Sequence, residues 1–251
     1  MLKALIFDVD GTLADTEHLH LRAFNAAFAD AGLEWHWSLP FYKTLLKVAG
    51  SRERMQHYSD RYQPGFSQRP DWETLLSQLQ ASKNQHYSLL VRQGAAKFRP
   101  GVGRLLAEAQ EAGLYLAIAS TAGHDNIRVL LEENLGTAAT ERFALIAAGS
   151  VVKDKKPSPA IYRWLLEQLD LHPRDCVAFE DSENGVRSAV GAGICTVVTV
   201  NDFTIDDQFR GASIVLDCLG EPERPFQVLA GDAGHATYVD LALLRQLVRG
   251  R

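Results

Sequence analysis

Two aspartates follow the first apolar stretch of the chain. Asp8 and Asp10 come directly after Leu5–Phe7, and Gly11 and Thr12 follow them. In a strand, residues i and i+2 point to the same side, so both carboxylates would project where this strand ends. Ligands of open α/β sheets bind at that end of the strands. The pair predicts a site for a hard cation such as Mg²⁺, with acid–base or nucleophilic chemistry, the alternative being two solvated turn residues.

A hydroxyl pair and a lysine occur at two later junctions of the same kind. Ser120 and Thr121 end the apolar run 114–119 and lead into a predicted helix. Hydroxyl and backbone N–H groups at a helix start bind anions, although such residues also serve as simple N-caps. Lys156 precedes helix 158–169, where an ammonium group can neutralise a phosphate. The alternative for this lysine is a solvated surface run.

A second acidic pair follows a third strand. Glu180 and Asp181 end the predicted strand 176–179 and would lie beside Asp8 and Asp10. Four neighbouring carboxylates repel one another unless a cation is present, so the second pair strengthens the prediction of a metal site. The alternative is a helix cap followed by a first-turn charge.

The elements that position these residues alternate between strand and helix from about residue 94 onward. This alternation predicts an α/β fold: a Rossmann-like, doubly wound parallel sheet with right-handed crossovers. The expected strands are the Asp8 strand, 114–119, 143–147, 176–179, 194–200 and 214–216. The expected helices between them are 102–112, 125–135, 158–169 and 183–192.

A block of helices interrupts this core after its first strand. Residues 17–31 carry apolar side chains at helical spacing, 39–62 indicate two helices split at Gly50, and 71–93 indicate a longer one. We therefore predict a core of residues 1–15 and 94–220 with an inserted small all-α cap of residues 16–93. Residues 221–251 are expected to be an extension, helical near its end, that packs on the core or trails from it.

Composition excludes several classes of protein. The chain has 251 residues, 46% of them hydrophobic and 23% charged, and a formal net charge of −5, which argues against nucleic-acid binding. Its three cysteines are too few and too scattered for a disulfide framework or a zinc site. No apolar run is long enough to span a membrane, and no secretory signal is evident. We expect a cytoplasmic protein, or one of an organelle stroma if a transit peptide precedes this sequence.

The order of the four polar groups resembles that of the haloacid dehalogenase superfamily of aspartate-based phosphotransferases, over residues 1 to about 220. The resemblance implies that Asp8 is the nucleophile, which becomes an aspartyl-phosphate, and that Asp10 is the general acid and base. It implies that Ser120, Thr121 and Lys156 bind the transferred phosphoryl group. It also implies a Mg²⁺ site made by Asp8, the Asp10 backbone carbonyl, Glu180 and Asp181.

The insertion is similar to the helical cap of the subgroup that contains β-phosphoglucomutase and the CbbY-type xylulose-bisphosphate phosphatases. The sequence motif Lys-Lys-Pro-Ser-Pro-x-Ile-Tyr most resembles that of the CbbY type. Arg52 and Arg54 suit bidentate capture of a distal phosphate, and Thr16 and His20 share a helix face. The resemblance implies substrate contacts from Thr16, Glu17, His20, Gly50, Ser51, Arg52, Glu53, Arg54 and Lys83.

These resemblances imply a Mg²⁺-dependent phosphatase acting on a sugar (bis)phosphate, with xylulose-1,5-bisphosphate as first choice. The alternative is a β-phosphoglucomutase that uses the same aspartyl-phosphate chemistry. A non-catalytic sugar-phosphate sensor is disfavoured, because both Asp8 and Asp10 are present. The expected partner is a small phosphosugar, with no nucleic acid and no membrane. We expect a monomer, because one chain supplies both the cap and a complete site.

Overall fold

The computed structural model describes residues 1–149 and 151–250 and divides the chain into two compact units. The core unit consists of Met1–Asp15 and Lys97–Arg251, and the helical unit consists of Thr16–Ala96. The helical unit thus begins where the sequence predicts and ends at Ala96 rather than at residue 93.

The core unit is built on one sheet with the strand order β3-β2-β1-β4-β5-β6-β7. All neighbouring strands are parallel except β6 and β7, which are antiparallel. The strands are β1 (Ala4–Phe7), β2 (Tyr115–Ala119), β3 (Leu145–Ala147), β4 (Cys176–Glu180), β5 (Cys195–Thr199), β6 (Ile214–Leu216) and β7 (Val228–Gly231). The helices are α5 (Val102–Glu111), α6 (His124–Leu135), α7 (Ala160–Gln168), α8 (Glu183–Gly191) and α9 (Leu241–Arg249). This confirms the predicted doubly wound fold.

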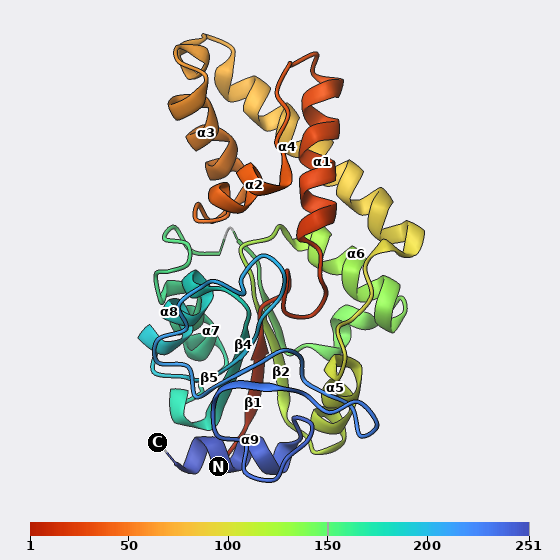
Figure 1. Ribbon diagram of the computed structural model, residues 1–251, viewed down its shortest axis with the longest axis vertical. Helices are drawn as coiled ribbons and strands as arrows, with labels where there is room; N and C mark the ends of the chain where they lie inside the picture. The colour runs from red at the N-terminus through yellow and green to blue at the C-terminus, as the bar shows by residue number, and fades with distance from the viewer. Residues whose placement is uncertain (150, 251) are drawn as a thin grey trace. The chain divides into compact units, whose positions relative to one another are not determined.

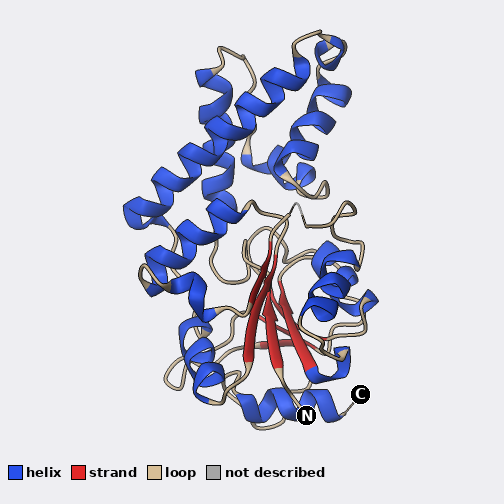
Figure 2. Ribbon diagram, turned by 180° about the vertical axis from the view of Figure 1, so that it is seen from behind, coloured by secondary structure: helices blue, strands red, loops and turns tan. Residues whose placement is uncertain are grey.

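Helices cover the sheet on both sides, with α5 and α6 on one face and α7 and α8 on the other (Figures 1 and 2). Strands β1, β4 and β5 are buried along their whole length, which explains their continuous apolar sequences. Ala4 and Ile6 pack with Tyr162 and Leu165 of α7 in the core beneath that helix. The sheet is therefore a rigid platform whose strand ends can hold side chains in fixed positions.

The order of the strands creates a topological switch point between β1 and β4. From β1 the chain winds outward through β2 to β3, and it then returns to β4 and winds the other way through β5 to β6. The loops after β1 and β4 consequently diverge, which leaves a crevice at the carboxyl ends of these two strands. Asp8 follows one of them, and Glu180 ends the other.

The extension predicted after residue 220 belongs to the core unit. Strand β7 lengthens the sheet, with Ile214 of β6 opposite Gly231. The sequence analysis missed β7 because all its residues are exposed, so this edge strand has no apolar alternation. Helix α9 begins after Asp240, whose side chain accepts a hydrogen bond from the Leu243 N–H (2.8 Å).

The helical unit contains α1 (Glu17–Asp30), α2 (Leu39–Leu45), α3 (Ser51–Tyr62) and α4 (Trp72–Leu90). Its core is aromatic: Trp37 is fully buried, with its ring centroid 4.7 Å from that of Phe24 and 4.9 Å from that of Phe28. The Asn25 side chain holds the Trp37 backbone by donating to its carbonyl (2.9 Å) and accepting from its N–H (2.8 Å). These aromatic side chains therefore form the packed core of the helical unit. No helix in the two described stretches of chain is long and apolar enough to cross a membrane.

Candidate active site

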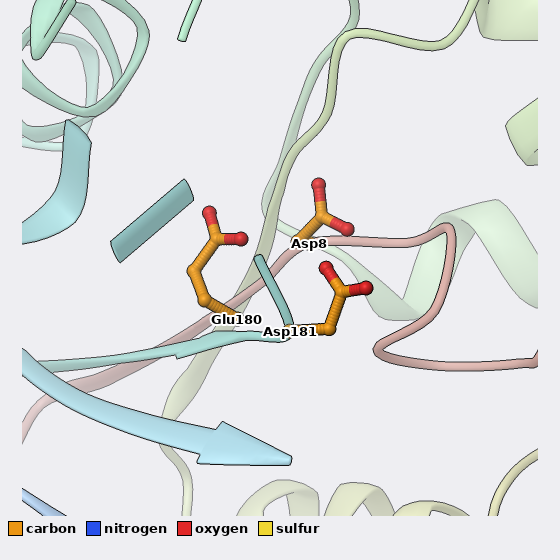
Figure 3. A group of neighbouring side chains, drawn as sticks. All are labelled: Asp8, Glu180 and Asp181. Carbon is orange, nitrogen blue, oxygen red and sulfur yellow. The ribbon is translucent and has the colours of Figure 1, made fainter. Parts of the chain in front are cut away.

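Asp8 and Glu180 occupy equivalent positions at the carboxyl ends of the neighbouring strands β1 and β4. The register pairs Phe7 with Phe179, whose rings stack with their centroids 4.4 Å apart, and the Asp8 N–H donates to the Phe179 carbonyl (3.0 Å). The next residue on each strand is therefore an acid, and Asp181 follows Glu180 directly. Figure 3 shows the three carboxyl groups gathered at these strand ends.

These three carboxylates form a candidate cation site. One oxygen each from Asp8, Glu180 and Asp181 lies within 4.8 Å of the others, and the three residues are 8%, 0% and 5% exposed. The Glu180 Oε2 atom is buried and has no hydrogen-bond partner among the described residues. Because buried carboxylate oxygens need a compensating donor or cation, the donor set and this orphaned atom fit a hard divalent ion such as Mg²⁺.

Lys156 lies between two of these carboxylates. Its ammonium donates to Asp8 Oδ1 and Glu180 Oε1 (both 2.7 Å) and to the Ala119 carbonyl (2.8 Å) at the end of β2. The Tyr162 hydroxyl of α7 donates to the same Glu180 oxygen. The single positive charge of Lys156 balances only part of the negative charge of Asp8, Glu180 and Asp181, so the site attracts a second cation.

Burial governs the protonation of this cluster. Burial, with a smaller contribution from the charges of Glu180 and Asp10, raises the pKa of Asp8 to about 7 against the opposing effect of the Lys156 charge. Burial by itself would lower the pKa of Lys156, but the charges of Asp8 and Glu180 reverse this, so its pKa is raised and it stays cationic. Burial and the Glu180 charge also raise the pKa of the Tyr162 phenol well above its usual value. The phenol therefore remains a donor.

Two glycines allow the acidic groups to approach the backbone. A Cβ on Gly185 would lie 1.8 Å from Glu180 Oε2, and a Cβ on Gly11 would lie 2.2 Å from Asp181 Oδ2. Gly11 also has a φ of +86°, which disfavours any side chain there. The absence of a side chain at these two glycines therefore leaves room for the Glu180 and Asp181 carboxylates in their observed positions.

The remaining predicted residues of the core unit lie on the adjoining loops. Asp10 is half-buried in the turn after β1, which a hydrogen bond from the Gly11 N–H to the Ala14 carbonyl (2.8 Å) closes. Ser120 follows β2 and is 1% exposed, and its Oγ accepts from the Ala122 N–H (3.1 Å). Thr121 is half-buried beside it. Ser120 thus orders its own loop, and its role toward a phosphate stays a prediction.

Three functional candidates escaped the sequence analysis. Tyr162 holds Glu180, Asn201 donates to Asp181 Oδ2 (2.8 Å), and Arg99 donates to the Gly11 carbonyl. Asn201 lies just past β5, so the rule that found Asp8 and Glu180 would have found it too. No such pattern marked Arg99, because an arginine before Pro-Gly is typical of an ordinary loop.

In the helical unit, three predicted or newly found residues form a chain of hydrogen bonds. Arg54 is 8% exposed and donates to the Leu45 carbonyl (3.2 Å) and to the Tyr42 hydroxyl (3.0 Å). Tyr42 in turn donates to Glu17 Oε2 (2.7 Å). Arg54 therefore orients Glu17 through a phenol, a link that the sequence does not reveal.

The other predicted residues of the helical unit have varied surroundings. Arg52 pairs with Glu73 on α4 (2.5 Å) and keeps 40% of its side chain exposed. Lys83 is 1% exposed, with its Nζ 5.3 Å from the ring centroids of both Phe24 and Tyr87. His20 is buried and stacks on Tyr87, with centroids 4.2 Å apart. Thr16 is buried at the N-cap position of α1, Gly50 stands at that of α3, and Ser51 and Glu53 lie on the first turn of α3.

A family comparison decides what this arrangement is. The model of the haloacid dehalogenase-like hydrolases matches residues 2–193. The chain belongs to this family. The match covers the helical unit and every strand that contributes to the acidic cluster. The predicted phosphatase is confirmed, since relatives of this chain are themselves named phosphatases.

Individual relatives agree with the family. A CbbY protein of Cupriavidus necator is 48% identical over 244 residues, which cover 97% of this chain and 96% of that protein. A mutant CbbY of Rhodobacter sphaeroides, crystallised with xylulose-1,5-bisphosphate, superposes with a TM-score of 0.81 at 40% identity, over 87% of this chain and 95% of that one. The β-phosphoglucomutase of Bacillus subtilis is 25% identical over 197 residues, 78% of this chain and 82% of that protein. The predicted CbbY-like resemblance is confirmed.

Proposed function

We propose that this hydrolase is a Mg²⁺-dependent sugar-phosphate phosphatase that works through an aspartyl-phosphate on Asp8, with xylulose-1,5-bisphosphate as its substrate. The observation that carries the proposal is the buried cluster of Asp8, Lys156, Glu180 and Asp181 at the switch point of the sheet. The identity to CbbY proteins, one of which was crystallised with this bisphosphate, supports the substrate.

Asp8, Glu180 and Asp181 would hold the cation, together with the Asp10 backbone carbonyl. A bound Mg²⁺ would offset the carboxylate charge and polarise the phosphoryl oxygens. Lys156 favours the ionised form of Asp8 and orients it by donating to Oδ1, and Tyr162 holds Glu180 in place. Positioning and charge stabilisation of this kind account for most of the catalysis of phosphoryl transfer.

In the first step, an Asp8 carboxylate oxygen attacks phosphorus, the bond from phosphorus to the sugar oxygen breaks, and Asp10 donates the proton that the leaving oxygen needs. In the second step, Asp10 takes a proton from water, whose oxygen attacks the aspartyl-phosphate. Inorganic phosphate leaves, and both aspartates return to their starting states. Ser120, Thr121 and Lys156 are assigned to the phosphoryl oxygens.

We assign recognition of the sugar and its distal phosphate to the helical unit, through Glu17, Arg52, Arg54 and Lys83. The Arg54–Tyr42–Glu17 chain supports this assignment, because it keeps a carboxylate in one orientation suited to sugar hydroxyls. Thr16, His20, Gly50, Ser51 and Glu53 complete the proposed set.

The proposal is tested by measuring phosphate release from xylulose-1,5-bisphosphate and a panel of sugar mono- and bisphosphates, with Mg²⁺ and with EDTA. We expect Mg²⁺-dependent release, strongest from the bisphosphate, and an acid-stable, hydroxylamine-sensitive phosphate on Asp8. Formation of glucose 6-phosphate from β-glucose 1-phosphate without net phosphate release would instead establish the mutase. Phosphate release that survives Asp8→Asn would contradict the mechanism.

A further inference from the structure

Arg99 is a buried arginine in the loop that precedes α5, and it carries no role in the chemistry above. It is 8% exposed, and its guanidinium donates to four backbone carbonyls. Nη1 donates to Gly11 and Thr199 (3.0 Å for the latter), and Nη2 donates to Val200 and Asp217 (2.9 Å for the latter). One side chain thus joins the turn after β1 to the ends of β5 and β6.

The same residue also holds the far end of that turn. The Arg99 N–H donates to the Leu13 carbonyl (2.8 Å), and its Nε lies 3.3 Å from Asp15 Oδ1. A β-bridge between Ala14 and Phe98 runs alongside. Arg99 therefore contacts the segment that follows Asp10 at Gly11, Leu13 and Asp15.

The Gly11 carbonyl links this arginine to the acidic cluster. The Asn201 side-chain amide lies 3.4 Å from the same carbonyl oxygen and donates to Asp181 Oδ2 (2.8 Å). Gly11 has no room for a side chain against Asp181 and Asn201. The Gly11–Thr12 peptide, one residue after Asp10, is therefore held by two side chains from separate parts of the core unit.

We propose that Arg99 is a positioning residue for Asp10: by holding the Gly11 carbonyl, it sets the direction from which Asp10 delivers a proton to the leaving oxygen. The inference rests on the proposed function. Only arginine offers five N–H donors in a rigid plane, which this set of carbonyls requires. Removal of the guanidinium would leave several buried carbonyls without a donor, so replacement of Arg99 is expected to move these carbonyls rather than leave them in place.

The inference predicts different effects on the hydrolysis of two kinds of phosphate ester. An alkyl phosphate has a basic leaving oxygen that needs the proton from Asp10, whereas p-nitrophenolate leaves readily without one. A misplaced general acid therefore slows the first and spares the second. A general loss of structure would slow both equally.

The experiment compares kcat/KM for glycerol 1-phosphate and p-nitrophenyl phosphate in the full-length Mg²⁺-loaded protein and its Arg99→Met and Arg99→Lys variants. We expect Arg99→Met to lose about 100-fold on the alkyl ester and about threefold on the aryl ester, since displacement of a catalytic group by about 1 Å costs that much. Arg99→Lys keeps the charge with fewer donors, and we expect it to recover part of the selective loss.

Arg104→Met is the matched control. Arg104 lies in the first turn of α5 and is also held by several partners, namely Glu221 (3.1 Å) and the Gly220 carbonyl (2.9 Å). We expect equal, small effects on both esters. Equal losses on the two esters in the Arg99 variants, or the selective loss in Arg104→Met, would overturn the inference.

If Arg99→Met does not fold, as judged by its thermal unfolding, Arg99→Lys carries the comparison by itself. The proposed function fails by a different result. Wild-type protein that cleaves glycerol 1-phosphate but no sugar phosphate would refute the substrate class, while the selective loss in the Arg99 variants would still decide the inference.

Discussion

Lys156 in the core unit and Lys83 in the helical unit are both almost completely buried, yet their surroundings differ. Lys156 donates to two carboxylates at 2.7 Å, whereas Lys83 lies 5.3 Å from the centroids of two aromatic rings. The buried arginines of the two units both donate to backbone carbonyls, Arg99 in the core unit and Arg54, to Leu45, in the helical unit. Arg54 also lies over the rings of Phe24 and Tyr42.

Opposite charges at hydrogen-bond distance hold a cation in one position, because the directional bonds are strong in a buried site. Aromatic faces attract a cation with much less directionality. We propose that the core unit carries out the step common to every phosphate ester and that the helical unit binds the groups that differ among substrates. Changes at the nucleophile or at Lys156 in the core unit should affect all esters alike, and changes in the helical unit should be selective for the sugar.

Replacement of Asp8 is expected to have the largest effect. Asp8→Asn keeps the shape of the side chain but removes the nucleophile, so turnover of every phosphate ester should fall by about 10⁴-fold or more. Phosphate release is the measurement, and Asp154→Asn, which changes an exposed aspartate on the nearby lysine-rich loop, is the control. Loss on sugar phosphates alone would mean that the two units do not divide the work as proposed.

Loss of Lys156 should be next. Lys156→Met leaves Asp8 and Glu180 buried without their cation, which should lower the free energy of unfolding by about 3 to 5 kcal/mol and reduce turnover of all esters. Urea unfolding and phosphate release measure the two effects. The exposed neighbour Lys153, changed to Met, should alter neither. Unchanged stability in Lys156→Met would show that the carboxylates do not depend on it.

The burial of Asp8 among other charges in the core unit should appear as a pH dependence of stability in metal-free protein. Because the pKa of Asp8 is raised to about 7, the folded protein binds this proton more tightly than the unfolded chain does. The free energy of unfolding should therefore fall as the pH rises from about 5 to about 8. Urea titrations in EDTA measure this. Asp8→Asn or added Mg²⁺ should flatten the slope, and an equal slope in Asp8→Asn would assign it to other groups.

The smallest expected effect lies in the helical unit. Tyr42→Phe keeps the packed ring but breaks the link between Arg54 and Glu17. We expect kcat/KM for the sugar bisphosphate to fall about tenfold, the cost of one or two hydrogen bonds, and that for p-nitrophenyl phosphate to stay unchanged. Tyr58→Phe, which loses a hydrogen bond from Gln63 in the same unit, is the control. Equal losses on both esters would contradict the proposed division of roles between the core unit and the helical unit.

Much of the site follows from position along the chain. Polar residues at the ends of apolar runs identified Asp8 and Glu180, because parallel strands bring such ends to one edge of the sheet. We applied this rule only to acidic, hydroxyl and lysine side chains, and it therefore missed Asn201. Exposed β7 was missed because an edge strand needs no buried side chains.

Arg52 and Arg54 show a different limit. They are the same residue type two positions apart on one helix, so they face different directions. One pairs with Glu73 at the surface, and the other is buried against Tyr42. Periodicity separates the two faces, but only the packing of α3 in the helical unit decides which face is buried.

The sequence by itself determined the fold class, the helical insertion and the four polar groups of the core unit, because each depends on local periodicity and on residues next to strand ends. The tertiary structure alone decided which partners those groups meet. Tyr162, Asn201 and Arg99 reach the site from distant segments, and their contacts with Glu180, Asp181 and Gly11 join residues 18, 20 and 88 positions apart. Contacts at such separations depend on how the helices and loops pack around the sheet, and no local pattern records them.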